Sequence, residues 1–142
     1  NQNLKIYVTD FPTPEMLGRK DVISMPHIGA STSEAEENCA IMAADQLIDY
    51  LEQGNICNSV NFPKTKMPRH GGYRITFCNK NVPKILGNVL TLLADCSLNV
   101  IDMVNKSRNE IAYNIIDVES EPTQELLEKI SSVEGILSVR LV

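Results

Sequence analysis

Apolar residues follow two different spacings in the first sixty residues of the chain. Short apolar runs at 4–9 and 22–25 predict two strands. From Ser33 to Gln53 apolar side chains recur every three or four positions, which predicts one long helix. Its apolar stripe is broad, as in a connecting helix packed on several sides or in an ordinary core helix. A short strand is expected at 56–62.

The run 22–25 and the residues after it place one histidine, His27, between a strand and the long helix. The apolar run 22–25 predicts a buried strand, and Gly29 permits a tight turn. Ser31 and Glu34 have the S-x-x-E spacing of a capping box, so the helix is expected to begin there. His27 is thus expected at the carboxyl end of a strand, where open α/β sheets bind ligands.

The second half of the chain predicts a separate small fold. Residues 64–71, rich in proline and basic side chains, are expected to be a linker between residues 1–63 and 72–142. Alternating or apolar runs predict strands, and three-and-four spacing predicts helices. The strands are expected at 73–78, 99–107, 111–118 and 137–141. The first helix is expected after the first strand, with Pro83 in its first turn, and the second helix is expected at 123–132. This βαββαβ order predicts a ferredoxin-like α+β sandwich with both helices on one face.

Charge and composition exclude several functions. The 142 residues carry a formal net charge of −5 without a cluster of lysine and arginine, which argues against nucleic acid or an anionic membrane as partner. No apolar run is long enough to span a bilayer, so a cytoplasmic protein is expected. The four cysteines form no C-x-x-C pair and there are only two histidines, so no metal site is expected.

Two motifs in the first half resemble one enzyme family. They are Pro-His-Ile-Gly-Ala-Ser-Thr at 26–32, continued by Glu-Ala-Glu-Glu-Asn at 34–38, and Asn-Ser-Val-Asn-Phe-Pro at 58–63. Together they resemble the end of the catalytic region of the D-2-hydroxyacid dehydrogenases, in particular the D-3-phosphoglycerate dehydrogenases. The resemblance implies a Rossmann-type catalytic region, NAD as cofactor and 3-phosphoglycerate as substrate. It also implies that His27 is the acid/base partner of hydride transfer, and that His27, Ile28, Gly29 and Ala30 lie against NAD.

A carboxylate is expected beside the second ring nitrogen of that histidine, where it would fix the tautomer. The family places a glutamate upstream of the histidine, but the corresponding stretch is shorter here. Either Asp10 or Glu15 can serve. Each also has an ordinary interpretation, Asp10 as a turn former at a strand end and Glu15 as a helix-start residue.

The chain lacks the G-x-G-x-x-G fingerprint that holds the pyrophosphate of NAD, and it begins at Asn1 without a methionine. We therefore expect a carboxy-terminal fragment of a longer enzyme, with most NAD contacts upstream. The fragment alone is expected to be inactive.

A third motif, Asn-Lys-Asn-Val-Pro-Lys-Ile-Leu-Gly at 79–87, together with Leu-Asn-Val at 98–100, resembles the ACT domain, a small amino-acid-sensing module. The resemblance implies a homodimer and an amino-acid effector such as L-serine. The residues matching the effector contacts are Asn79, Asn81, Asn99 and Val100. Asparagines also cap helices and occupy turns, and Lys84 replaces a glycine usual in the motif.

Two other functions compete with the dehydrogenase fragment. One is a regulatory module that only binds amino acids and oligomerises, for which residues 26–34 have no use. The other is a dehydrogenase of a different 2-hydroxy acid, which the resemblance to ACT domains disfavours.

Overall fold

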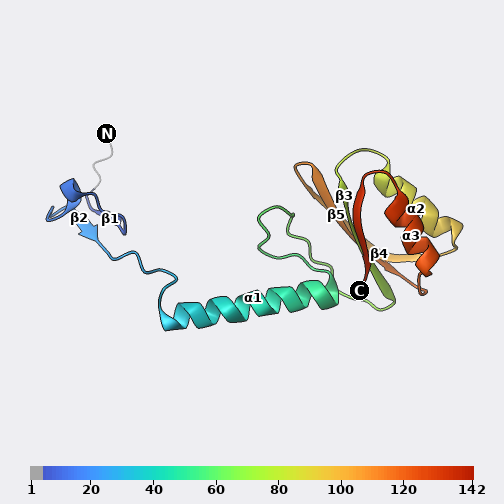
Figure 1. Ribbon diagram of the computed structural model, residues 1–142, viewed down its shortest axis with the longest axis horizontal. Coiled ribbons are helices and arrows are strands. Elements are labelled where there is room, and N and C mark those ends of the chain that lie inside the picture. The colour runs from blue at the N-terminus through green and yellow to red at the C-terminus, as the bar shows by residue number, and fades with distance from the viewer. Residues whose placement is uncertain (1–4) are drawn as a thin grey trace. The chain divides into compact units, whose positions relative to one another are not determined.

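The computed structural model describes residues 5–142, which form two compact units, one up to Met42 and one from Ala43 (Figure 1). The first unit contains two parallel strands, β1 (Tyr7–Thr9) and β2 (Val22–Ser24), with the 3₁₀ turn η1 (Pro14–Met16) between them. Leu4, where the first strand was expected to begin, lies outside the described residues. The division at Met42 precedes the predicted linker at 64–71.

The long helix is confirmed as α1 (Ser33–Gln53), but its cap differs from the prediction. The hydroxyl of Thr32, not of Ser31, accepts a hydrogen bond from the backbone N–H of Ala35, at 3.1 Å. The backbone N–H of Ser31 instead donates to the carbonyl of Ile28, at 2.8 Å, inside the preceding turn. Because Ser31 belongs to that turn, the helix begins only at Ser33. The capping box predicted from Ser31 and Glu34 therefore does not form.

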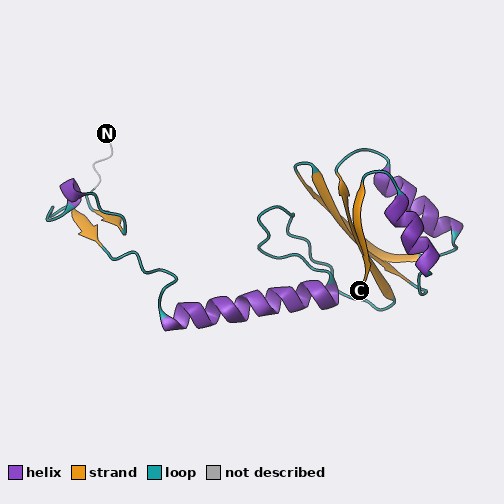
Figure 2. Ribbon diagram, viewed as in Figure 1, coloured by secondary structure: helices purple, strands orange, loops and turns teal. Residues whose placement is uncertain are grey.

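The second unit confirms the predicted βαββαβ order. It consists of β3 (Tyr73–Lys80), α2 (Ile85–Asp95), β4 (Val100–Arg108), β5 (Ile111–Val118), α3 (Gln124–Ser132) and β6 (Ile136–Leu141). The sheet order is β4-β5-β3-β6 with every neighbouring pair antiparallel, a ferredoxin-like arrangement. Both helices cover the same face of the sheet (Figure 2).

The main core lies between that face and the two helices. Strands β3 and β5 supply Ile75, Phe77, Ile116 and Val118, and the helices supply Val89, Leu93, Leu126 and Ile130. The alternation of apolar residues along the strands directs these side chains inward, as the sequence predicts. The prediction that Pro83 lies in the first turn of α2 is wrong. The left-handed conformation of Lys84, with φ of 77°, ends the preceding turn, so the helix begins at Ile85.

The opposite face of the sheet is partly covered by the chain between α1 and β3. Ile56 and Met67 are buried there against Cys78, Tyr113 and Ile115. Residues 56–62 do not form the predicted strand, because Ile56 makes only an isolated bridge with Thr65 and its side chain packs on the sheet instead. The predicted linker at 64–71 is likewise packed in part, since Thr65 and Met67 are buried.

The carboxyl end of α1 is held by side chains of the second unit. The helix has no basic residue in its last turn, although its terminal carbonyls lack partners within the helix. Side chains from the rest of the unit donate hydrogen bonds to these carbonyls. The pairs are Arg140 with the carbonyls of Tyr50 and Leu51, Arg69 with Glu52, Arg74 with Gln53, and Tyr113 with Gly54.

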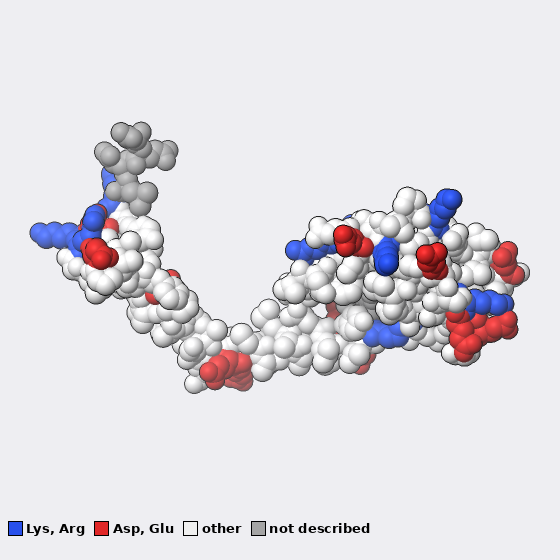
Figure 3. All heavy atoms as spheres, turned by 45° about the horizontal axis from the view of Figure 1, so that its top comes forward, with Lys and Arg blue, Asp and Glu red and all other residues white. Residues whose placement is uncertain are grey.

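Acidic and basic side chains are interspersed over the second unit on the face shown in Figure 3. No helix within residues 5–142 is long and apolar enough to cross a membrane.

Candidate functional site

The first unit brings a histidine and a carboxylate together. Because β1 and β2 are parallel, residues that follow each strand lie at the same edge of the pair. Asp10 directly follows β1, and His27 follows β2 after Met25 and Pro26. The Nδ1 atom of His27 lies 2.7 Å from Oδ2 of Asp10. The Phe11 ring packs on the imidazole, with 4.3 Å between the ring centroids.

The geometry distinguishes the two carboxylates that the sequence left open. Asp10 is the hydrogen-bond partner of His27, and this bond lowers the pKa of the Asp10 carboxyl. Glu15 lies in the η1 turn, where a hydrogen bond to the side chain of Thr13 lowers the pKa of its carboxyl. The ordinary interpretation of Glu15 as a helix-start residue therefore agrees with its position.

A carboxylate can only accept a hydrogen bond, so Nδ1 of His27 must carry the proton that lies between the two groups. The Nε2 atom is then the ring nitrogen that can take up or release a proton. Both side chains are about half exposed in the described residues. The pair therefore has the chemistry of a general acid/base on an accessible surface.

The prediction of a buried strand at 22–25 is wrong for the described residues. Ile23 and Met25 are each 49% exposed, because no layer within the described residues of the first unit covers this two-stranded sheet. The apolar run nevertheless forms the strand β2 as far as Ser24.

The residues expected to face a cofactor, His27, Ile28, Gly29 and Ala30, are all exposed in the turn before α1. A side chain at Gly29 would meet no atom within 4 Å, so the space beside its backbone is open. The exposed turn therefore leaves room for the ring end of a dinucleotide. The backbone cradle for a pyrophosphate has no counterpart in this sequence.

The four expected effector residues do not meet within one chain. Val100 begins β4 and pairs with Val118, which pairs with Tyr73 at the start of β3. Asn79 lies at the other end of β3, roughly 20 Å away along an eight-residue strand. Asn99 therefore belongs to one end of the sheet, and Asn79 and Asn81 to the other.

The three asparagines also differ in how they are bonded. Asn79 is buried, where its amide donates to the carbonyl of Lys80 and accepts from Asn114, both within 2.7 Å. Asn81 donates to the backbone carbonyl of Asn109 at 3.1 Å, and Asn99 donates to Glu119 at 2.8 Å. Asn81 and Asn99 are exposed and accessible to a ligand, whereas the hydrogen-bonding groups of Asn79 are occupied.

A crevice of about 270 Å³ lies beside the turn between β3 and α2. Lys84 lines it together with Asn88 and Gly135. A cationic side chain thus stands at the expected effector turn, in a backbone conformation that favours glycine.

The residues that hold the end of α1 were not predicted from the sequence. Arg74 alternates with apolar residues along β3 and so resembles a solvent-facing position, yet its side chain is completely buried. One signal was available: α1 ends without a basic residue, so its carbonyls require donors from elsewhere.

The fold and site define a chain of two parts, a strand-and-helix segment with an imidazole–carboxylate pair and a ferredoxin-like unit. The chain is similar to D-3-phosphoglycerate dehydrogenases. It is 32% identical to the enzyme of Haemophilus influenzae over 123 residues, which cover 86% of this chain and 30% of that enzyme. It is 31% identical to the Escherichia coli K12 enzyme over 124 residues, with the same coverage. Against D-3-phosphoglycerate dehydrogenase 2 of Saccharomyces cerevisiae the identity is 31%, over 92% of this chain and 29% of that one.

The predicted resemblance to this family of enzymes is confirmed, and the chain spans about 30% of the length of the curated relatives it matches. No family model matches the chain. Among solved structures, the ACT domain of the GTP pyrophosphokinase of Chlorobium tepidum covers 49% of this chain and 95% of its own, with 14% identity and a TM-score of 0.44. The regulatory subunit of aspartate kinase from Thermus thermophilus covers 49% of each chain, with 20% identity and a TM-score of 0.42.

Proposed function

We propose that this chain is the carboxy-terminal part of an NAD-dependent D-3-phosphoglycerate dehydrogenase of the cytoplasm, which oxidises 3-phosphoglycerate to 3-phosphohydroxypyruvate in serine biosynthesis. The hydrogen bond of 2.7 Å between Asp10 and His27 carries the proposal. The similarity to such enzymes over 86% of the chain supports it.

In this proposal His27 is the catalytic acid/base. Its Nε2 atom removes the proton of the substrate's C2 hydroxyl during oxidation and returns it in the reverse direction. A bound NAD would supply the acceptor for the hydride that leaves C2. Asp10 is a positioning residue, since it keeps the proton on Nδ1 and stabilises the imidazolium that forms. Residues 27–30 offer the open surface on which the nicotinamide end would rest.

The experiment uses the full-length enzyme with His27→Ala. The substitution removes the proton acceptor, so turnover is expected to fall by about 10²- to 10⁴-fold while NAD binding stays nearly unchanged. His70→Ala is the matched control, because His70 is an exposed histidine outside the site, and it should keep normal turnover. Retention of most activity by His27→Ala would remove His27 from the mechanism.

We further propose that the ferredoxin-like unit forms a homodimer and binds an amino-acid effector across it, as ACT domains do. Asn81 and Asn99 are exposed at opposite ends of the sheet, so a site that uses both needs residues from two copies. Neutral amides suit a zwitterion, because they donate to the carboxylate and accept from the ammonium group.

Calorimetric titration with L-serine, combined with light scattering, tests the regulatory part. A dimer at micromolar concentration with saturable serine binding is expected, and glycine is the control ligand. A monomer in solution would contradict the proposed assembly, and a dimer without serine binding would restrict the unit to assembly or to another effector.

A further inference from the structure

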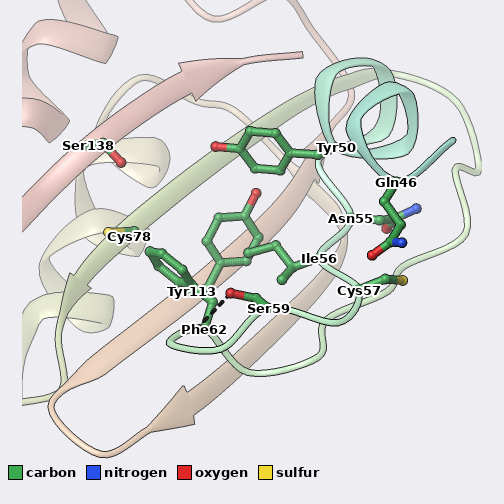
Figure 4. A pocket seen from close by; sticks show the side chains of 10 residues that line it. All are labelled: Gln46, Tyr50, Asn55, Ile56, Cys57, Ser59, Phe62, Cys78, Tyr113 and Ser138. Carbon is green, nitrogen blue, oxygen red and sulfur yellow. Dashed lines mark hydrogen bonds between the residues drawn. The ribbon is translucent and has the colours of Figure 1, made fainter. Parts of the chain in front are cut away.

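A cavity lies within the second unit, on the sheet face opposite α2 and α3 (Figure 4). It has a volume of about 230 Å³. Its walls come from the carboxyl end of α1, from residues 55–62 and from strands β3, β5 and β6. The expected effector residues Asn79, Asn81, Asn99 and Val100 do not line it.

The walls are aromatic and held in place by hydrogen bonds. Phe62 and Tyr113 meet edge to face, with 6.1 Å between their ring centroids. The Tyr113 hydroxyl donates to the carbonyl of Gly54 at 2.7 Å, and the backbone N–H of Phe62 donates to Ser59 at 3.1 Å. The cavity is therefore preformed and offers rings against which another ring can pack.

Two hydroxyl groups at this cavity remain available. The side-chain hydroxyls of Tyr50 and Ser138 have no hydrogen-bond partner among residues 5–142. In Figure 4 the Tyr50 hydroxyl points toward the side of the cavity where β6 carries Ser138. The pair can donate to and accept from a polar group placed between them.

Ionic side chains are absent from the lining, since none of the ten residues drawn in Figure 4 is Asp, Glu, Lys, Arg or His. The neighbouring Arg140 donates to the carbonyls of Tyr50 and Leu51, and its guanidinium carbon lies 4.5 Å from the centre of the Tyr50 ring. A charged ligand would lose hydration here without gaining an ionic partner. The cavity therefore selects against ions and against amino-acid zwitterions.

We propose that this cavity binds a small uncharged aromatic molecule that carries one amide-type donor and acceptor. The rings of Phe62, Tyr113 and Tyr50 hold its aromatic part, and the hydroxyls of Tyr50 and Ser138 bind its amide. The volume is below the roughly 300–1,000 Å³ of sites for drug-sized ligands, so the ligand has one or two fused rings. The site is separate from the proposed effector site and does not depend on dehydrogenase activity.

The test uses benzamide as probe and benzoate as its charged counterpart of the same shape. The ¹⁵N-labelled 142-residue chain is titrated with each while its amide NMR signals are followed. Benzamide is expected to shift the signals of Cys57, Cys78, Tyr113 and Ser138 in a saturable way, and benzoate to bind about tenfold more weakly or not at all.

Variants locate the site within the cavity. Tyr50→Phe and Ser138→Ala each remove one hydroxyl and are expected to weaken benzamide binding about threefold to tenfold. Ser138→Phe fills an exposed part of the cavity and should abolish binding. Ser107→Phe is the matched control, an exposed serine on the edge strand β4 outside the cavity, and should bind as the unaltered chain does.

Three results would overturn the proposal: no saturable shift with benzamide at these four residues, benzoate binding as tightly as benzamide, or unchanged binding in both Tyr50→Phe and Ser138→Ala. The two hydroxyl variants preserve the packing, so they keep the test decisive if Ser138→Phe does not fold.

Discussion

Arg74 and Asp117, opposite each other on β3 and β5, form a bidentate ion pair with both side chains completely buried. The Nε and Nη2 atoms of Arg74 lie 2.6 and 2.7 Å from the two carboxylate oxygens. The remaining donors of Arg74 reach the carbonyls of Gln53, Met67 and Pro68, at 2.8 to 3.1 Å. All five N–H groups are thus used, which offsets the cost of removing both charges from water.

Asp117→Asn is expected to destabilise the chain by about 3–5 kcal/mol, because it leaves the Arg74 charge buried without its partner. Urea unfolding measures the loss. Asp21→Asn is the matched control, since Asp21 pairs with Arg19 on the exposed surface and should leave the midpoint nearly unchanged. Equal losses of stability in the two variants would show that burial does not determine how much the ion pair contributes.

The Asp10 carboxyl is expected to titrate below its usual range, because the hydrogen bond to His27 lowers its pKa. Carbonyl NMR of Asp10 as a function of pH measures this. His27→Ala should return the pKa to the range of an ordinary aspartate. A lowered pKa in the folded state means that the stabilising contribution is present above the unfolded pKa and is lost as pH falls through the folded pKa. An unchanged pKa in His27→Ala would assign the shift to another cause.

Lys84→Gly is expected to stabilise the second unit by about 1 kcal/mol, because Lys84 has φ of 77° and glycine adopts this conformation without strain. Thermal or urea unfolding checks the gain. Lys106→Gly in β4 is the control and should destabilise by about 0.5–1 kcal/mol, since glycine weakens a strand interior. A loss of stability in Lys84→Gly would mean that contacts of the lysine side chain outweigh the backbone strain.

Gly72→Ala is expected to cost about 2 kcal/mol or more. Its φ is 71°, and an added Cβ would lie 2.3 Å from the backbone carbonyl oxygen of Val118, which cannot move without disturbing β5. Gly29→Ala is the control, because the added Cβ would meet nothing within 4 Å. The stability of this variant should equal that of the unaltered chain. Urea unfolding compares the two. Similar urea midpoints for the two variants would show that the turn before β3 accommodates the added Cβ at little cost.

The sequence by itself determined the elements whose signals are local. The apolar spacing from Ser33 to Gln53 and the run from Ile111 to Val118 predicted their bounds correctly, because helix and strand periodicity is contained in the segment itself. The order of such segments also predicted the ferredoxin-like unit, since βαββαβ connections leave few antiparallel arrangements. The place of His27 between a strand and a helix was predicted in the same way and agrees with the positions of β2 and α1.

Contacts between distant residues were decided only by the tertiary structure. The choice of Asp10 over Glu15 as partner of His27 follows from parallel pairing of two strands, which brings both strand ends to one edge. The burial of Arg74 follows from the path of the chain over the open face of the sheet, where the carbonyls of Met67 and Pro68 supply partners. The same path buries residues expected to form a linker. Periodicity describes which face of an element a side chain occupies, but only packing decides what that face meets.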